Sequence, residues 1–478
     1  MNYRIVAYTL GWVLNIEGAC LLLPVICSLI YGDGCVPTYL ITMAVCLVAG
    51  VSLTLKKPKN KAMYSEEGFT TVALSWVVLS LFGCLPFVIS GYIPNFVDAL
   101  FETVSGFSTT GATILTDVEA LPKSLLLWRS FTHWLGGMGV LVFLVALLPL
   151  SGGGNMHLIR AESTGPAVSK LVPKVKSTAK ILYAFYVAFT VLELILLLLG
   201  GLSFFEALNT SFATAGTGGF GIYNTSISGF SPYVQYVVTV FMIIFGVDFS
   251  IYYLLIIKHM GKALWSAEFR TYIAIIVSAI VLIGINCRGM YATLEETFRH
   301  SAFQVASLIS STGYMTVDFD LWPEFSKTIL VILMFVGACA GSTGGGMKVS
   351  RFIILFKSIG KEIKLAAHPR LTHRISMNGR TVEHETVRSV SVFVMAYLAI
   401  FALAMLVISL DGFDFTTNFT AVATTINNMG PGLAGVGPTK NFSEFSMLSK
   451  TVFSFLMLTG RLEIFPMLVL ISPRAIRK

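Results

Sequence analysis

Runs of apolar residues separated by short polar segments are the dominant pattern of this sequence. A bilayer core is crossed by roughly 20 apolar residues in a helix, so each run predicts a membrane-spanning helix. Glu17 interrupts the first run and no small-residue cleavage site follows it, so we interpret that run as a retained span and not as a signal peptide. The pattern predicts ten spans, at 4–31, 36–55, 67–92, 124–149, 179–201, 232–257, 271–287, 326–347, 389–410 and 449–472.

A shorter, half-apolar segment rich in Ser, Thr and Gly lies between the members of each pair of spans after the first two. Each of these segments begins with a helix too short to cross a membrane and ends in a turn of small residues. The four segments read DALFETVSGFSTTGAT (98–113), EALNTSFATAGTGGFG (206–221), SAFQVASLISSTGYMT (301–316) and NFTAVATTINNMGPGL (418–433).

The fold class that follows is an all-α integral membrane protein. We expect four tandem helix–pore loop–helix repeats around a central ion pathway, preceded by two extra transmembrane helices. Internal repeats of this kind define an architecture. The expected boundaries are 1–60 for the two N-terminal helices and 61–165, 166–265, 266–375 and 376–478 for the repeats.

The glycine loops predict a pathway for cations. Non-helical backbone at membrane depth is tolerated only where it is buried in protein or lines a watery cavity. Four loops around one axis satisfy this condition together, and their carbonyl oxygens would replace the hydration shell of a cation. Each half-helix also directs the partial negative charge of its C-terminus toward the ion. Unrelated surface loops are the alternative, which is disfavoured because all four loops are in register with the spans.

Composition and charge agree with a membrane protein of defined orientation. Only 12% of the 478 residues are charged and 55% are hydrophobic, whereas soluble domains carry about twice that share of charge. The net charge of +8 is concentrated in short segments. The positive-inside rule places these segments, and with them both termini, in the cytoplasm. They flank spans and lack an aromatic platform, which disfavours nucleic-acid binding. The basic segments are 56–61, 150–178, 258–270, 348–388 and the C-terminus.

Enzyme chemistry finds no support in the motifs. The seven cysteines form no CxxC pair, and HETVR (384–388) lacks the second histidine of a zinc protease motif. No G-x-S-x-G nucleophile motif occurs. A sodium- or proton-coupled symporter remains an alternative. Such carriers usually contain inverted repeats, whereas four loops repeated in one sense favour a channel-like pore.

These residues resemble the Trk/Ktr/HKT superfamily of potassium transporters, and within it the Trk H-type membrane subunit. The resemblance covers essentially the whole chain, and the two spans before the first repeat favour the Trk H-type over the shorter Ktr type. The motifs that carry it are SGFSTTGAT (105–113), TGGF (217–220), SSTG (310–313), NNMGPG (427–432), GSTGGGMK (341–348) and GRLE (460–463).

The resemblance implies that the four glycine loops form a selectivity filter in which backbone carbonyls bind potassium. Glycine at all four key positions goes with potassium preference in this family, and all four are glycine here. Whether Gly218 or Gly219 takes the key position in the second loop is open, although a gapless alignment from Asp98 and Glu206 favours Gly219. The implied filter residues are Thr109, Thr110, Gly111, Thr217, Gly218, Gly219, Ser311, Thr312, Gly313, Asn427, Asn428, Met429 and Gly430.

A run of glycines interrupts the second helix of the third repeat. Such a run does not hold a stable helix inside a span. A phosphate-binding loop is the rival interpretation, but Met347 separates the last glycine from Lys348 and the required pattern is not met. The resemblance implies an intramembrane loop below the filter that gates the pore. The implied gate residues are Gly341, Ser342, Thr343, Gly344, Gly345 and Gly346, with Lys348 and Arg461.

Arg461 is the most informative single residue of the last span. A charge in apolar surroundings costs a few kcal/mol unless it faces a cavity or a partner. Glu463 is two positions away, on a different helix face, and is a poor partner. The resemblance implies that Arg461 is an electrostatic barrier beside the gating loop. Lys348 either assists it or is an ordinary boundary lysine.

Other polar residues within the spans have simpler interpretations. We expect structural pairing, and not transport, for three acidic residues and tight helix packing at His133 and Trp134, which lie beside GGMG. The three acidic residues are Glu17, Glu193 and Asp248.

No segment is suited to binding a nucleotide, since 348–388 is the longest non-membrane stretch and is too short. We expect no cofactor in this chain, with potassium as the transported ion. The resemblance implies a homodimer of this chain in the cytoplasmic membrane. It also implies a separate, cytosolic nucleotide-binding regulatory subunit. The basic loops are candidate docking surfaces, while anionic lipid headgroups explain the same charges more simply. Whether transport is passive or proton-coupled stays open.

Overall fold

The computed structural model describes residues 2–58, 64–137, 139, 175–257, 260–369 and 374–471. This part of the chain is helical apart from one small antiparallel hairpin, β1 (Ser376–Met377) and β2 (Arg380–Thr381), in which Ser376 pairs with Thr381. Asn378 and Gly379 connect the strands with φ of 53° and 75°. Asn-Gly is the preferred sequence for such a two-residue turn. The expectation of an all-α fold is confirmed.

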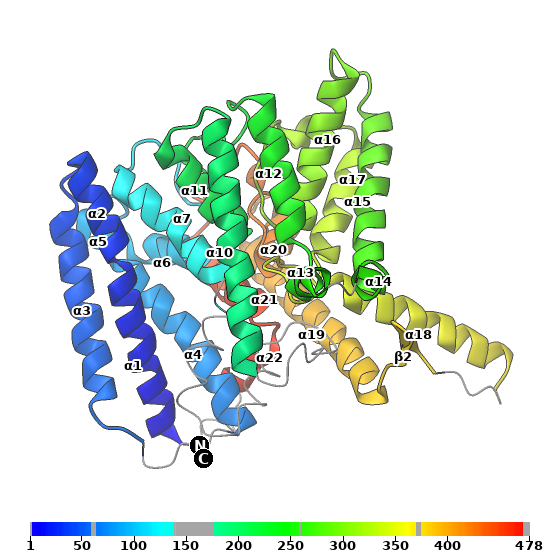
Figure 1. The fold of residues 1–478 in the computed structure, drawn as a ribbon, viewed down its shortest axis with the longest axis horizontal. Coiled ribbons are helices and arrows are strands. Elements are labelled where there is room, and N and C mark those ends of the chain that lie inside the picture. The colour runs from blue at the N-terminus through cyan, green and yellow to red at the C-terminus, as the bar shows by residue number, and fades with distance from the viewer. Residues whose placement is uncertain are drawn as a thin grey trace.

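The chain begins with two hydrophobic helical segments at the periphery (Figure 1). The first is α1 (Tyr3–Cys20) followed by α2 (Leu22–Tyr31), and the second is α3 (Val36–Thr54). Four groups of helices follow, and each contains a short half-helix between longer helices. The first three groups are α4 (Ser65–Gly83), α5 (Leu85–Ser90), α6 (Phe96–Phe107) and α7 (Lys123–Gly137); α10 (Val175–Leu199), α11 (Phe204–Ala215), α12 (Pro232–Phe245) and α13 (Phe249–Ile256); and α15 (Ala267–Asn286), α16 (Leu294–Ile309), α17 (Glu324–Val336) and α18 (Val349–Ala367).

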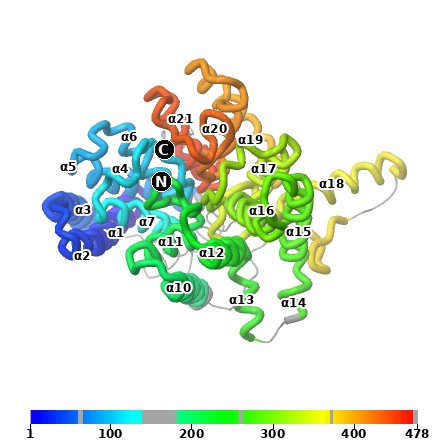
Figure 2. The backbone as a smooth tube through the Cα atoms, turned by 90° about the horizontal axis from the view of Figure 1, so that it is seen from above, coloured from blue at the N-terminus to red at the C-terminus, as the bar shows by residue number. Residues whose placement is uncertain are grey.

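The fourth group follows the hairpin. It consists of α19 (His384–Ile408), α20 (Phe415–Ile426), α21 (Met447–Arg461) and α22 (Phe465–Ile471). A short helix, α14 (Met260–Leu264), connects the second group to the third, and single 3₁₀ turns lie at Phe319–Leu321, Ser409–Asp411 and Ala434–Val436. Seen from above, the four groups follow one another around a common centre, with α1–α3 outside the ring (Figure 2). The expected architecture of four repeats and two extra helices is therefore observed, while the exact repeat boundaries stay predictions.

The half-helices α6, α11, α16 and α20 contain 12, 12, 16 and 12 residues. At 1.5 Å per residue the shorter ones span about 18 Å, well short of the roughly 30 Å of a bilayer core. Each begins at a side-chain cap, from Asn95, Ser203, Thr293 and Asp414. Hydrogen bonds from Thr417 to Asp414 hold the pKa of this capping carboxyl below its usual range. These caps fix where each half-helix starts.

Six helical segments of the described chain are long and apolar enough to cross a membrane, or seven if α12 and α13 count as one. The second helices of the last three repeats are shorter than predicted because they break. The helices α12 and α13 meet at 90°, so the predicted span 232–257 is interrupted between Phe245 and Phe249. Likewise, α17 ends at Val336 and α18 starts only at Val349, and Leu462–Ile464 separates α21 from α22. Most of the second half of the predicted span 124–149 lies outside the described residues.

Candidate functional site

The four half-helices end in the same backbone turn. In each turn one residue has a left-handed conformation, namely Thr109 (φ 57°), Thr217 (54°), Ser311 (61°) and Asn428 (53°). The next N–H donates back to a carbonyl five residues earlier. The bonds are Thr110 to Ser105 (2.9 Å), Gly218 to Ala213 (2.9 Å), Thr312 to Ser307 (2.9 Å) and Met429 to Thr424 (2.8 Å). This pattern is the Schellman motif, which normally places glycine at the left-handed position.

Retaining Thr, Ser and Asn at a left-handed position costs about 1–2 kcal/mol for each residue. Strain of this kind concentrates at functional sites. Here the side chains make specific bonds: Ser311 Oγ accepts from the Gly345 N–H (2.6 Å). Asn428 Nδ2 donates to Thr110 Oγ1 (3.1 Å) and to the Met457 carbonyl (2.7 Å). The strained residue of the third loop thus contacts the glycine run of its own repeat, and that of the fourth loop contacts the first repeat.

The key glycine of each loop lies two positions after the strained residue. Gly111, Gly219 and Gly313 have φ of 81°, 74° and 83°, whereas Gly430, which precedes Pro431, has no positive φ. The second loop therefore matches the others through Gly219, as the gapless alignment favoured.

The glycines bring the four loops together in a closed ring. A Cβ on Gly111 would lie 1.9 Å from the Gly218 carbonyl oxygen, and one on Gly219 would lie 2.0 Å from the Thr312 oxygen. A Cβ on Gly313 would lie 3.2 Å from the Gly430 nitrogen, and one on Gly430 would lie 3.0 Å from the Gly111 oxygen. Each loop therefore contacts the next one, and the fourth contacts the first. The structure brings all thirteen predicted filter residues into these four adjacent turns.

The predicted gate segment lies directly against this ring. Non-helical backbone extends from Gly337 to Lys348, which is longer than the predicted glycine run. We call residues 337–348 the intramembrane loop. The Gly346 N–H donates to the Asn427 carbonyl (3.0 Å), next to the bond between Gly345 and Ser311. The loop therefore contacts the third and fourth filter turns through its backbone.

Arg461 connects the intramembrane loop to the first repeat. Its Nη1 donates to the Thr343 carbonyl and its Nη2 to the Gly136 carbonyl, both at 2.8 Å. It does not pair with Glu463, as expected. Lys348 is 3% exposed and its ammonium group donates to the Gly344 carbonyl, so it is a buried part of the loop and not a surface lysine.

Two ion pairs near the site, one of them buried and the other partly buried, were not predicted from the sequence. Arg129 Nη2 lies 2.7 Å from Glu102 Oε1, both side chains are buried, and Glu102 also accepts from the Ile114 N–H (3.0 Å). Glu463 pairs with Arg351 at the end of the intramembrane loop. The sequence does contain a signal for the first pair, because Glu102 and Arg129 are charged residues inside apolar segments.

The other polar candidates lie at different places. Asp248 Oδ1 accepts from the Ser250 N–H (2.8 Å) and caps α13, and a Cβ on Gly341 would lie 2.7 Å from it. His133 Nδ1 lies 2.8 Å from the Gly106 carbonyl oxygen, which agrees with a packing role. Glu17 and Glu193 are fully buried, but neither makes an ion pair within the described residues, so the pairing predicted for them is not found there.

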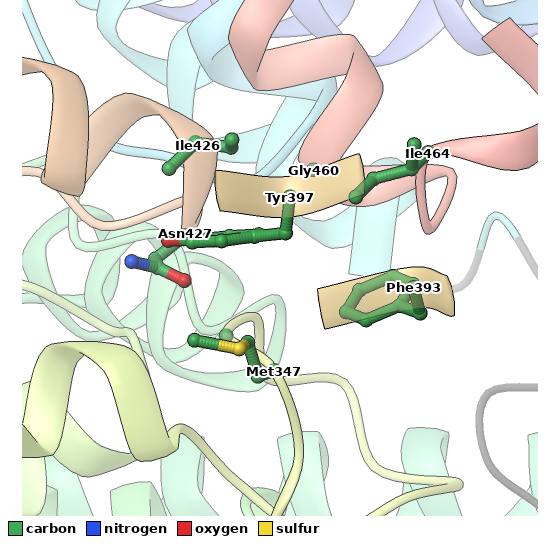
Figure 3. A pocket seen from close by; sticks show the side chains of 8 residues that line it. Met347, Phe393, Tyr397, Ile426, Asn427, Gly460 and Ile464 are labelled. Carbon is green, nitrogen blue, oxygen red and sulfur yellow. The ribbon is translucent and has the colours of Figure 1, made fainter. Parts of the chain in front are cut away.

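A small cavity lies below the fourth filter turn, between the intramembrane loop and α19 (Figure 3). Its volume is about 10 Å³, close to what one water molecule needs. The Tyr397 ring extends toward the Asn427 side chain in this view (Figure 3). The Tyr397 hydroxyl and Asn427 Oδ1 are both buried without a hydrogen-bond partner among the described residues. The Tyr397 hydroxyl is directed at the Asn427 side chain.

Comparison with known proteins gives the same picture. A family model described as TrkH, cation transport protein, matches residues 36–476. The chain belongs to the TrkH family of cation transport proteins. It is 36% identical over 481 residues to the Trk system potassium uptake protein TrkH of Escherichia coli strain K12, which covers 99% of both chains. The TrkH protein of Halomonas elongata is 33% identical, with full coverage of both.

The structural similarity extends over the whole chain. The crystal structure of the potassium transporter TrkH from Vibrio parahaemolyticus matches with a TM-score of 0.89 at 32% identity and covers 100% of both chains. Membership of the TrkH family makes the chain a transporter and not an enzyme. For a transporter of this family the cation is cargo and not a cofactor.

Proposed function

We propose that this protein mediates potassium uptake across the cytoplasmic membrane through the centre of the ring of four loops. The observation that carries the proposal is the closed ring itself, in which four similar turns meet through glycines that leave little room for a side chain. Rings of backbone carbonyls select potassium by replacing its hydration shell. The relatives in Escherichia coli and Halomonas elongata are named potassium uptake proteins.

The filter residues in this proposal are those of the four turns, 109–111, 217–219, 311–313 and 427–430. The half-helices end at these turns, so the partial negative charge of each C-terminus is directed at the ring. Glycine stands at the key position of every loop. This supports a preference for potassium over sodium.

The gate in this proposal is the segment Gly341–Gly346 together with Lys348 and Arg461. Two cationic groups lie next to this segment, since the partly buried Arg461 and the buried Lys348 donate to its Thr343 and Gly344 carbonyls. A cation passing this level meets two positive charges in a medium of low dielectric constant, where Coulomb repulsion is strong. The loop therefore opposes conduction both by its backbone and by these charges.

The proposal includes cytoplasmic termini, a homodimer and a cytosolic nucleotide-binding regulatory subunit. The helix α18 supports a further assembly because it extends away from the helical body in both views (Figures 1 and 2). Its large apolar side chains Phe356, Ile359 and Ile363 are between 56% and 69% exposed. Basic residues at its cytoplasmic end are suited to lipid headgroups or an acidic protein surface.

Transport in proteoliposomes tests the proposal. We expect uptake of radioactive rubidium that potassium suppresses far better than sodium. Gly313→Ser would weaken this preference, because the new Cβ lies 2.9 Å from Pro431 Cδ and 3.2 Å from the Gly430 nitrogen. Gly284→Ser is the matched control, since its Cβ would meet only the Ser301 hydroxyl at 4.0 Å.

Three results contradict parts of this proposal. Equal competition by sodium and potassium would refute the selectivity, and uptake that requires a sodium or proton gradient would establish a coupled symporter instead. No uptake in either the presence or absence of a cytosolic subunit would refute the pore.

A further inference from the structure

Glu268 begins the first helix of the third repeat, yet its carboxylate faces the intramembrane loop. It is 8% exposed. Its Oε1 accepts from the Ala340 N–H at 2.7 Å and from the Ser350 N–H at 3.2 Å. Because Ala340 and Ser350 lie on either side of the gate segment, a single oxygen atom holds both ends of that segment. The glycine motif itself gives no indication of this contact.

The intramembrane loop is thus held from two sides. On the filter side, Ser311 and Asn427 accept from Gly345 and Gly346. On the other side, Glu268 binds the N–H groups of Ala340 and Ser350. Both bonds are buried, so breaking them would leave two backbone N–H groups without a partner in a buried environment. Glu268 is therefore a major restraint on a segment that is rich in glycine and has little stiffness of its own.

The same end of α15 contacts the exposed hairpin 376–381. The Ala267 N–H donates to Asn378 Oδ1 at 2.7 Å, one residue before Glu268. The hairpin is in turn bound to α18, because Lys357 Nζ donates to the Ser376 carbonyl at 2.6 Å. Asn378 itself is exposed. A continuous set of bonds therefore connects an accessible surface to both ends of the gate segment.

We propose that Glu268 is a positioning residue that holds the intramembrane loop across the ion pathway, and that displacement of the hairpin 376–381 loosens this restraint through α15. The inference rests on the proposed function, because it assigns a regulator to the same gate. The hairpin carries Arg380 and follows Arg374, and α18 presents Lys357 beside it. A cytosolic protein with an acidic surface is the partner that this chemistry fits.

Four variants separate this role from a general loss of structure. Glu268→Ala removes both hydrogen bonds, whereas Glu268→Gln retains an oxygen that accepts them. Asn378→Ala breaks the bond between α15 and the hairpin and disfavours the left-handed turn at residue 378, so it displaces the hairpin while Glu268 stays intact. Glu296→Ala is the matched control, because Glu296 Oε2 also accepts a backbone N–H, from Ala292 at 3.2 Å, but at the opposite end of the third repeat.

The first readout is rubidium uptake without any cytosolic partner. We expect Glu268→Ala to raise the initial rate about tenfold, since the loss of two buried hydrogen bonds shifts the loop equilibrium by at least that factor. Glu268→Gln and Glu296→Ala should match the wild type, and Asn378→Ala should fall in between. The preference for potassium over sodium should be unchanged in all four, because the filter turns are intact. Glu268→Asp, one methylene shorter, replaces the alanine variant if that protein does not fold.

The second readout does not depend on transport. Cys339 precedes Ala340 and is fully buried. In a variant that retains Cys339 as its sole cysteine, a released loop should expose this thiol to a water-soluble maleimide. We expect faster labelling with Glu268→Ala and unchanged labelling with Glu268→Gln. Unchanged labelling and uptake in a folded Glu268→Ala protein would overturn the inference, as would equal effects of alanine and glutamine. If the wild type carries no ions while labelling still follows this order, the proposed function fails and the restraint on the loop stands.

Discussion

The ring of four glycines predicts that one added methyl group has very different effects on selectivity at different glycines. Gly111→Ala places a Cβ 1.9 Å from the Gly218 carbonyl oxygen, and Gly430→Ala places one 3.0 Å from the Gly111 oxygen. Carbon–oxygen contacts normally lie at about 3.3–3.6 Å. The first substitution therefore separates two loops by about 1.5 Å, and the second by about 0.4 Å. Gly111 also has φ of 81°, where alanine costs about 1–2 kcal/mol, whereas Gly430 has no positive φ.

Selectivity should follow this geometry. We expect Gly111→Ala to abolish the preference for potassium over sodium, because a carbonyl of the second loop no longer keeps its place in the ring. Gly430→Ala should keep a clear preference with a moderately lower rate. The assay is rubidium uptake in proteoliposomes with either competing cation, after size-exclusion chromatography has verified the fold. Gly284→Ala, at a position open to a Cβ, is the control. Equal losses of potassium preference in the Gly111 and Gly430 variants, or a larger loss at Gly430, would refute the ring as the determinant of selectivity.

Three further predictions concern the groups around the ring. Glu102→Gln should lower the free energy of unfolding by about 3–5 kcal/mol, because it leaves the Arg129 guanidinium buried without its carboxylate. Adding Arg129→Met should recover most of that loss. Reversible unfolding in mixed micelles measures both effects. Tyr397→Phe should weaken the potassium preference in competition assays without changing expression, because it removes the hydroxyl that faces the Asn427 side chain of the fourth turn. Arg461→Ala should raise rubidium uptake several-fold by removing the positive charge next to the Thr343 carbonyl. The uptake rate of Arg461→Lys should lie closer to that of the wild type. An unchanged rate in the alanine variant would contradict the electrostatic barrier.

The repeat architecture was predictable because its signals are local. A half-helix with a capping residue at its start and a left-handed turn at its end needs only a dozen consecutive residues, and the sequence contains four of them in register with the spans. The gapless alignment that favoured Gly219 over Gly218 agrees with the left-handed φ of 74° at Gly219. Local chemistry was also sufficient to expect that Gly341–Gly346 is not helical.

The bend between α12 and α13 was not predictable from local sequence. A single glycine is common in membrane-spanning helices and does not by itself break one. The bend at Gly246 depends on distant partners, because the Gly246 carbonyl accepts from the Cys339 N–H (3.0 Å) and the Gly341 carbonyl accepts from the Phe249 N–H (3.3 Å). Such contacts are long-range in sequence and become visible only when the third repeat is in place.

The charged partners were missed for two different reasons. Glu268 lies at the predicted boundary of a span, where an acidic residue is usually solvated, so no sequence rule distinguishes it. Arg351 likewise belongs to a basic segment that the positive-inside rule already explained. Glu102 and Arg129 could have been identified, since both interrupt apolar segments in the way that directed attention to Arg461. Their pairing across 27 positions would still have needed the fold.

The second helices of the last three repeats are all interrupted below the ring. Polar groups at one interruption form hydrogen bonds with groups at another. The α12–α13 break supplies the Phe245 and Gly246 carbonyls, which accept from Thr343 and Cys339 of the intramembrane loop. The break after α21 supplies Arg461, which donates back to that loop. Backbone groups at membrane depth need partners, so no one of these segments can move without leaving groups of another unpaired. Opening of the pathway is therefore expected to be a concerted rearrangement of the three breaks and not the swing of a single loop.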